Sequence, residues 1–270
     1  MSTAFDLVAS WPARNVAVGV TNATHTLDSM GEVEQVFPLA SVTKLLTAYA
    51  SLVALEEGAV ELDEPAGPAG STVRHLLAHA ASYEFDTRAT RGLPGERRMY
   101  SNAGFEVLAE HIEQATSIPF AQYAREAVFQ PLEMHATNLE KSPAAGGESC
   151  VNDLLKFARE LLHPTLLDTS TVQGATSVHF PGIDGLLPGF GRQKPNDWGL
   201  GFEIRGLKQP HWTGAHASTR TFGHFGQSGT FLWVDPDAQL ACVVLTDKPF
   251  GPWAAEVWPP FSDAVLKQYS

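Results

Sequence analysis

Strand-like segments lie near both ends of the chain and helix-like segments lie between them, and this order constrains the fold more than any other feature. Residues 15–31, NVAVGVTNATHTLDSMG, combine an apolar run with turn residues, which predicts a β-hairpin. From about residue 199, three further stretches read as strands: GLGFEIRG, RTFGHFGQSGTFLWVDP and AQLACVVLTD. This order predicts an antiparallel sheet assembled from the two ends of the chain, with a helical region inserted between them.

The middle of the chain has apolar residues at helical spacing, interrupted by loops rich in glycine and proline. Helices are expected in STVRHLLAHAA (71–81), NAGFEVLAEHIEQAT (102–116), PFAQYAREAVFQPLEM (119–134) and VNDLLKFARELLH (151–163). A last helix, PWAAEVWPPFSDAVLKQY (252–269), is expected to break at Pro259 and Pro260, because proline removes a helical hydrogen-bond donor.

These segments indicate an α/β (α+β) fold. Residues 1–60 and 199–270 are expected to form a sheet domain, and residues 61–198 an inserted, mainly helical domain. Residues 180–199 are rich in glycine and proline and are too long for a simple connector, so we expect them to form a functional rim.

Composition and charge limit the partners of the chain. Its 270 residues carry a formal net charge of −12, and an acidic surface repels nucleic acid. No apolar stretch reaches the roughly 18 residues that a membrane span requires, and the first residues show neither a basic leader nor a long apolar segment. We therefore expect a cytoplasmic protein that binds neither nucleic acid nor membrane, with Cys150 and Cys242 as free thiols.

The segment PLASVTKLLTAYASLVALEEG, residues 38–58, predicts one helix that ends at Gly58. Ser41 lies in its first turn and Lys44 follows three residues later, so both side chains lie on one helix face. N–H groups at a helix N-terminus stabilise negative charge, which favours an attacking serine. Desolvation would lower the pKa of the lysine so that its amine can accept the serine proton. The alternative is an ordinary helix start with an exposed lysine, because this spacing arises easily by chance.

A second pair of polar residues lies in MYSNAG, where Tyr100 and Asn102 face the same side of an extended segment. A tyrosine beside an ammonium group has its phenolate favoured and can act as a base. An asparagine can both donate to and accept from a substrate amide. The alternative is that Ser101 or Asn102 simply caps the following helix.

A third group lies in GHFGQSGTFLW. Gly226 permits close backbone approach, and the N–H of the next residue, Gln227, can help to hold an oxyanion. His224 is placed to donate to a substrate. The alternative is a glycine-rich hairpin strand with a structural histidine.

In chain order these three groups resemble the motifs of the serine β-lactamase and penicillin-recognising DD-peptidase family, most closely its class C branch, which also contains esterases. SVTK is similar to the S-x-x-K motif and YSN to the Y-x-N motif. HFG stands where the family has K-T-G or, in esterase-like and peptidase-like members, H-x-G. The resemblance covers nearly the whole chain. It implies a β-lactamase/transpeptidase-like fold, with an antiparallel sheet flanked by helices and an inserted all-helical region.

The resemblance also implies a catalytic role for three residues. Ser41 would be the acylated nucleophile, Lys44 would orient or deprotonate it, and Tyr100 would be the general base. Whether Tyr100 or Lys44 takes the serine proton stays open. No metal or cofactor is implied.

A substrate-binding role is implied for four more residues. Asn102 would bind Lys44 and a substrate amide, and His224 would replace the cationic lysine of K-T-G. The N–H groups of Ser41 and of Gln227, which follows Gly226, would form the oxyanion hole.

The chain departs from this family in three ways. His224 is only partly cationic at neutral pH, Phe225 replaces the usual hydroxyl residue, and the chain is shorter than secreted β-lactamases and shows no export signal. We therefore expect a serine hydrolase that forms an acyl-enzyme with a small-molecule ester or amide and acts less efficiently on β-lactams. The alternatives are a non-catalytic, penicillin-binding-like module that binds a ligand, and a true class C-type β-lactamase.

Other residues have simpler interpretations. His75 and His79 have the spacing of a zinc pair on one helix face, but the glutamate of H-E-x-x-H and a third ligand are missing. The family resemblance implies that both are structural. His211 and His216 are expected in a solvated loop, and Trp198 at the rim of the cleft. The sequence GQSGT is one glycine short of G-x-S-x-G, which disfavours an α/β-hydrolase.

Overall fold

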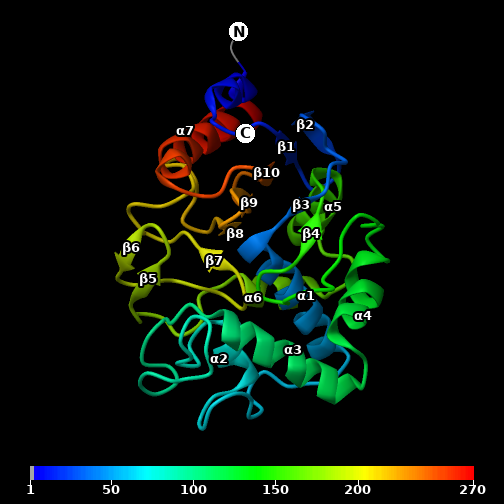
Figure 1. Cartoon of the computed structure of the whole chain (residues 1–270), viewed down its shortest axis with the longest axis vertical. Coiled ribbons are helices and arrows are strands. Elements are labelled where there is room, and N and C mark those ends of the chain that lie inside the picture. The colour runs from blue at the N-terminus through cyan, green and yellow to red at the C-terminus, as the bar shows by residue number, and fades with distance from the viewer. Residues whose placement is uncertain (1–2) are drawn as a thin grey trace.

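The computed structural model describes residues 3–270, which include a six-stranded antiparallel sheet with helices on both faces (Figure 1). The strand order is β2-β1-β10-β9-β8-β7. The strands are β1 (Val16–Thr21), β2 (Thr26–Met30), β7 (Glu203–Ile204), β8 (Phe222–Gly226), β9 (Thr230–Asp235) and β10 (Leu240–Thr246). The N-terminal hairpin pairs directly with the last strand, where Val18 lies opposite Val244. The expected sheet, built from both ends of the chain, is therefore confirmed.

Helices α1 (Thr43–Glu56) and α5 (Val151–Leu162) cover one face of the sheet. Strand side chains that point to this face, such as Leu232 and Val243, belong to the same apolar core as the buried residues of both helices. Helix α5 approaches β1 closely at Gly19, where a Cβ atom would lie only 2.6 Å from the Cδ1 of Leu155. A larger residue at position 19 would push the helix off the sheet.

Helix α7 (Pro252–Tyr269) and the 3₁₀-helix η1 (Ala4–Ser10) cover the opposite face. The expected break at Pro259 and Pro260 is wrong, because α7 runs through both prolines. Trp258 and Phe261, which flank the prolines, are fully buried against the sheet. This burial holds the helix together where local propensity would end it.

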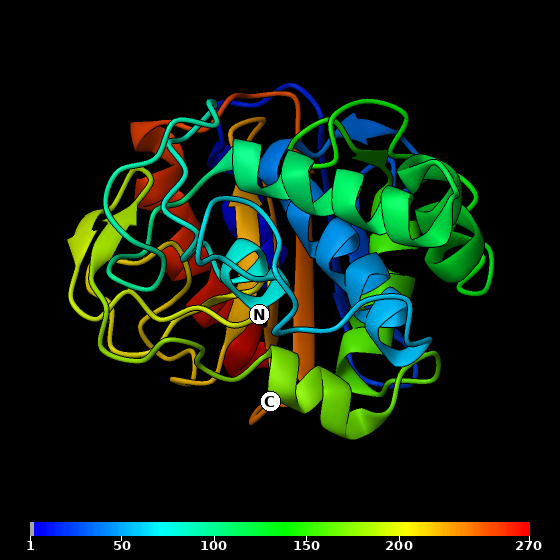
Figure 2. The same cartoon turned by 90° about the horizontal axis from the view of Figure 1, so that it is seen from below.

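The remaining helices lie in the region between the two halves of the sheet. They are the 3₁₀-turn η2 (Ala40–Val42), α2 (Val73–Leu77), α3 (Asn102–Thr116), α4 (Phe120–Ala124), the π-turn η3 (Arg125–Phe129) and α6 (Thr169–Ala175). Two small sheets pair β3 (Phe37–Pro38) with β4 (Glu148–Ser149), and β5 (Gly185–Leu187) with β6 (Gly191–Gln193). Helix α3 packs beside α1 and α2, as the view from below shows (Figure 2).

The proposed division into residues 1–60 with 199–270 and residues 61–198 stays a prediction. Helix α5 comes from the predicted insert, yet it packs on the sheet. Within residues 3–270, every helix falls short of the length and apolar character needed to cross a lipid bilayer. The expected cytoplasmic location likewise stays a prediction.

Helix α2 is shorter than the predicted helix at 71–81. It ends at Leu77, and His79 adopts a left-handed backbone conformation with φ of 52°. His75 and His79 therefore do not share one helix face, and the expected placement of the two side chains together on one helix is wrong. Thr72 is the N-cap of this helix.

Candidate active site

Ser41 lies in the 3₁₀-turn η2, which leads directly into helix α1. The preceding residue, Ala40, has φ of 46°, in the left-handed region that alanine rarely adopts. Such a conformation costs on the order of 1–3 kcal/mol and persists only where the surrounding structure imposes it. One turn later the Nζ atom of Lys44 lies 3.4 Å from the Ser41 Oγ. The predicted placement of the two side chains on one face agrees with this geometry.

The side chain of Lys44 is completely buried. Its amine donates to the Oδ1 of Asn102 at 2.6 Å and to the carbonyl oxygen of Ala144 at 2.9 Å. Burial lowers the pKa of Lys44 to about 7, while the nearby carboxylates of Asp86 and Glu106 oppose this shift. A large fraction of the amine is therefore neutral near physiological pH and able to accept a proton.

Tyr100 lies against the lysine, with its ring centroid 4.7 Å from the Lys44 Nζ. The tyrosine hydroxyl is buried, and burial raises its pKa well above the usual value, although the neighbouring Ser41 hydroxyl acts in the opposite direction. The expected stabilisation of the phenolate is therefore wrong, because desolvation of a buried negative charge, together with the nearby Asp86 carboxylate, disfavours the phenolate. Tyr100 is protonated in the free protein.

Asn102 is the first residue of α3, and Ser101 caps this helix by accepting a hydrogen bond from the N–H of Gly104. The Nδ2 of Asn102 donates to the Oδ1 of Asp86 at 2.7 Å. This contact turns the amide so that its oxygen faces Lys44. Asp86, which binds Asn102, and the Ala144 carbonyl, which binds Lys44, were not identified from the sequence, because both lie in loops and carry no motif spacing.

Strand β8 carries His224 and Gly226, Gln227 follows its last residue, and the strand packs against the 3₁₀-turn η2 that contains Ser41. Gly226 packs against the backbone that precedes Ser41, since a Cβ atom on it would lie 2.2 Å from the carbonyl oxygen of Leu39. Only glycine permits this approach, which places the Gln227 backbone beside the serine turn. Phe225 alternates to the opposite face of the sheet and packs on Phe250.

His224 is buried and uncharged. Its Nδ1–H donates to the carbonyl oxygen of Phe225 at 2.6 Å, and burial lowers its pKa to about 3, with Lys44 lowering it further. The expected partial positive charge is therefore wrong. The free Nε2 of the neutral ring is a hydrogen-bond acceptor and has no partner within residues 3–270.

An aromatic cluster surrounds Tyr100 on the side away from solvent. His79 and Trp198 pack on each other with centroids 4.7 Å apart, and both rings lie close to the Tyr100 ring. The expectation of Trp198 at the rim is wrong, because this side chain is almost completely buried. The Ser101 N–H donates to His79 Nδ1, so His79 helps to position the backbone that precedes α3.

His211 is also buried, contrary to the expected solvated loop. Its Nε2 lies 2.9 Å from the Oε2 of Glu203, which also binds Lys208 and accepts from the Trp212 indole at 3.0 Å. The paired charges allow this polar segment to be buried. His216 is exposed, as expected. Residues 3–270 contain no group of three or more ligands that could hold a metal, and both cysteines are free and buried.

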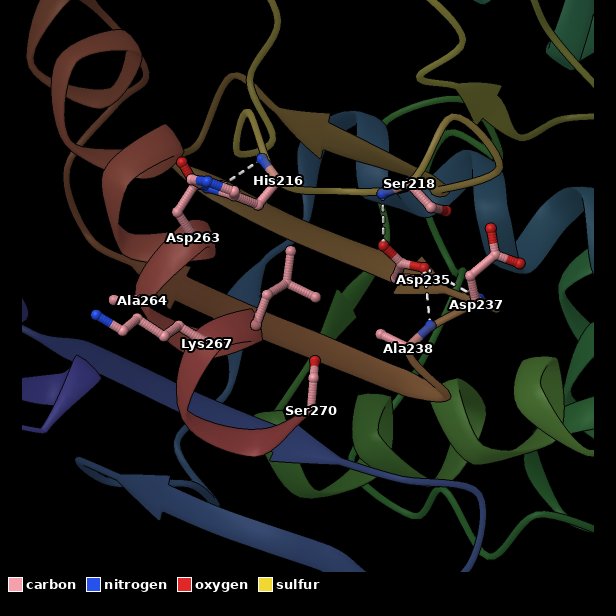
Figure 3. Close-up of a pocket in the computed structure, with 10 residues that line it drawn as sticks. His216, Ser218, Asp235, Asp237, Ala238, Asp263, Ala264, Lys267 and Ser270 are labelled. Atoms are coloured by element: carbon pink, nitrogen blue, oxygen red, sulfur yellow. Dashed lines mark hydrogen bonds and ion pairs between the residues drawn. The ribbon is translucent and has the colours of Figure 1, made fainter.

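A hollow of about 670 Å³ lies away from these residues, between the C-terminal end of α7 and the turn joining β9 to β10 (Figure 3). Asp235 and Asp263 point into this region, but their carboxylate oxygens already accept hydrogen bonds within the protein. Asp235 accepts from the N–H groups of Ser218, Asp237 and Ala238. The two carboxylates hold loops in place and do not form part of the site around Ser41.

Known proteins share both the sequence pattern and the fold of this chain. The family model described as Beta-lactamase matches residues 12–267. A solved structure described as a beta-lactamase from Mycobacterium bovis is 53% identical, covers 99% of both chains and has a TM-score of 0.98. Unliganded simvastatin synthase from Aspergillus terreus is 17% identical, covers 98% of this chain and 96% of that chain, and has a TM-score of 0.81. The latter similarity shows the fold alone.

The curated relatives are more distant. A protein from Salmonella heidelberg, provisionally named a D-alanyl-D-alanine carboxypeptidase, is 24% identical over 219 residues. The match covers 60% of this chain and 48% of that protein. The chain thus spans about half the length of the curated relatives it matches.

Proposed function

The chain belongs to the beta-lactamase family, and from this premise we propose that it is a serine hydrolase that forms an acyl-enzyme on Ser41. The observation that carries the proposal is a buried lysine amine whose pKa is lowered to about 7 and whose Nζ lies 3.4 Å from the serine Oγ. An ordinary exposed lysine would be almost fully protonated at neutral pH and unable to take the serine proton. Motif spacing alone does not make this distinction.

Acylation begins when the Ser41 oxygen attacks the substrate carbonyl carbon and its proton passes to the neutral amine of Lys44. This assignment is favoured over Tyr100 as the first base, because burial keeps the tyrosine protonated. The Tyr100 hydroxyl, close to both groups, can then give its proton to the departing alcohol or amine and regain one from the Lys44 ammonium.

The tetrahedral intermediate places negative charge on the former carbonyl oxygen. The proposed donors are the N–H groups of Ser41 and Gln227. The tight contact of Gly226 with Leu39 supports the proposal that these two N–H groups lie close to each other. Asn102 holds the lysine and, in this proposal, also contacts a polar group of the substrate. Water then attacks the acyl carbon, loses its proton to the same lysine–tyrosine pair and releases Ser41.

Esters and amides are the proposed substrates because the site lacks a permanent positive charge at His224, whose ring is neutral. A second candidate is β-lactam hydrolysis, which is favoured by the 53% identical Mycobacterium bovis protein described as a beta-lactamase. The two candidates share the acylation step and differ in the rate with each substrate.

The decisive experiment is covalent labelling by a fluorophosphonate, in which the serine oxygen bonds to phosphorus and fluoride leaves. Intact-mass analysis of the wild type should show one adduct, which Ser41→Ala abolishes and the remote Ser170→Ala retains. Turnover of a nitrophenyl ester and of penicillin would then be compared. An unlabelled but folded wild type would contradict the proposal, and penicillin turnover comparable to ester turnover would favour the second candidate.

A further inference from the structure

Buried polar atoms that lack a hydrogen-bond partner gather beside Tyr100. Within residues 3–270, eight buried side-chain nitrogen and oxygen atoms have no partner. Four of these atoms lie on aromatic or imidazole rings that contact one another, namely those of His79, Tyr100, Trp198 and His224. Buried polar groups in proteins are almost always hydrogen-bonded, so four such atoms in one place require a physical explanation.

The four rings form a contiguous group, which we call the ring cluster. The centroid of Tyr100 lies 5.5 Å from that of His224 and 5.8 Å from that of Trp198, and the latter two are 5.4 Å apart. His79 packs 4.6 Å from Tyr100 and 4.7 Å from Trp198. A water oxygen lies about 2.7–3.2 Å from each of its partners, so one molecule can bridge polar atoms on ring edges at these separations.

Contacts that the two histidines already make determine which of their nitrogens carries hydrogen. His79 Nδ1 accepts from the Ser101 N–H, and burial lowers the pKa of His79 well below its usual value. Its neutral ring therefore carries the hydrogen on Nε2, which is a donor. His224 has the opposite arrangement, because its Nδ1–H donates to the Phe225 carbonyl and its Nε2 is an acceptor.

The other two members complete the set of donors and acceptors. The Nε1–H of Trp198 can only donate, whereas the Tyr100 hydroxyl can donate and accept. The ring cluster thus offers two donors, one acceptor and one hydroxyl. A water molecule has two hydrogens and two lone pairs, and buried waters typically form two to four hydrogen bonds to such otherwise unpaired groups.

We propose that the ring cluster binds one ordered water molecule beside Tyr100. The water accepts from the Nε2–H of His79 and from the Nε1–H of Trp198. It donates one hydrogen to Nε2 of His224 and the other to the oxygen of Tyr100. All four ring atoms are then paired.

A second indole shows why the grouping of these atoms matters. The Nε1–H of Trp258 is also buried without a partner within residues 3–270, but its ring contacts are Phe225, Phe231, Phe250 and Trp253. This apolar surrounding supplies too few polar groups to hold a water. Trp258 is therefore a matched control for Trp198.

The water has a consequence for the proposed function, because it determines what the Tyr100 hydrogen is free to do. A phenol oxygen that accepts from the water keeps its own O–H for the side of Ser41, whose hydroxyl lies nearby. The same hydrogen bond stabilises the negative charge that develops on this oxygen when its proton passes to the departing alcohol. His79 and Trp198 are then positioning residues that act on Tyr100 through the water. This consequence, unlike the water site itself, rests on the proposed acylation of Ser41.

A high-resolution crystal structure of the wild type tests the site without any turnover. A water oxygen is expected within about 3.2 Å of at least three of the four ring atoms. It should be displaced or absent in Trp198→Phe and retained in Trp258→Phe. A wild type without electron density for this water, or with a direct hydrogen bond between His224 and Tyr100, would overturn the proposal.

The effect on Tyr100 is tested with 4-nitrophenyl butyrate and ethyl butyrate, which share an acyl group. Nitrophenolate departs without a proton, whereas the ethoxide must be protonated as it leaves. Trp198→Phe should lower kcat/KM for ethyl butyrate about three- to tenfold and leave the value for 4-nitrophenyl butyrate nearly unchanged, because one hydrogen bond to the water is lost. Trp258→Phe removes the same ring volume from the opposite face of the sheet and should not alter the ratio of the two values.

His79→Asn gives the same test if Trp198→Phe does not fold. Asparagine tolerates the left-handed backbone at position 79, where φ is 52°, and its side-chain oxygen can accept from the Ser101 N–H. The Nε2 donor to the water is lost, so the ratio should shift in the same direction.

The outcomes separate the water site from the proposed function. An unchanged ratio in a folded variant that has lost the water would overturn its action on Tyr100. A wild type that hydrolyses neither ester would instead contradict the proposed function, and the crystal structure would still decide whether the ring cluster holds the water.

Discussion

The Nζ of Lys44 lies 2.6 Å from the Oδ1 of Asn102, and this contact determines where the lysine amine can direct its lone pair. A neutral amine has two N–H groups, and two oxygen acceptors, on Asn102 and Ala144, are within reach of them. The ammonium form donates a third hydrogen to the Ser41 Oγ at 3.4 Å, whereas in the proposed neutral form both hydrogens are engaged and the lone pair is left for the Ser41 hydroxyl. Asp86 keeps the Asn102 amide from turning over, so this arrangement is fixed before substrate binds.

The pH dependence of ester hydrolysis should follow the lysine. The proposed mechanism requires a neutral Lys44, so kcat/KM for a neutral ester should rise with pH, reach half its plateau near pH 7 and stay level above it. His224, with its pKa lowered to about 3, and Tyr100, with its pKa raised, should add no titration between pH 5 and 9. A pH–rate profile from pH 5 to 9 checks this.

Asn102→Asp provides an independent check on that assignment. A carboxylate beside the amine favours the ammonium form, so the midpoint should move upward by about 1 pH unit or more. An unmoved midpoint would show that another group controls the profile.

The buried amine should also cost stability in a pH-dependent way. The pKa of Lys44 is about 7 in the folded protein and near 10.5 when the chain is unfolded, so the unfolded state binds more protons between these values and stability rises with pH across this window. In Lys44→Met this contribution disappears. The stability of the variant minus that of the wild type should therefore be about 3 kcal/mol larger at pH 6 than at pH 9.5, because the buried amine destabilises the wild type most at low pH.

Urea unfolding of both proteins at the two pH values measures this difference directly. Subtracting the unfolding free energy of the wild type from that of the variant cancels the contributions of the other titrating groups. A gap that does not change with pH would mean that Lys44 keeps a normal pKa, and it would remove the main support for its role as a base.

Much of the site follows from short-range spacing in the sequence. The Ser41–Lys44 relationship depends only on three residues of helix, and the alternation of His224 and Gly226 only on the two-residue period of a strand. Such relationships are local, so a pattern reveals them. The contacts of Asp86 and Ala144 join segments that no local period connects, and they are visible only after the chain has folded.

Other expectations failed where packing outweighed local preference. The segment around His211 reads as a solvated loop, yet Glu203 compensates Lys208 and His211, and all three side chains are buried. The pKa of Tyr100 depended on how deeply the hydroxyl is buried, which the motif does not specify. Burial is a property of the assembled structure, and charge patterns in a sequence do not fix it.

Gly226→Ala tests whether the contact of β8 with the serine turn matters for chemistry. The added methyl group would lie 2.2 Å from the Leu39 carbonyl oxygen and 2.6 Å from the Thr230 hydroxyl, so the strand or the turn must move. We expect kcat/KM to fall about 100-fold or more, because a displacement near 1 Å misplaces the proposed oxyanion donors. Stability should fall by about 1–3 kcal/mol. Gly174→Ala, within α6 and with open space around the new methyl group, is the matched control and should be neutral or slightly stabilising. Full activity in a stably folded Gly226→Ala protein would exclude the Gln227 N–H from the oxyanion hole.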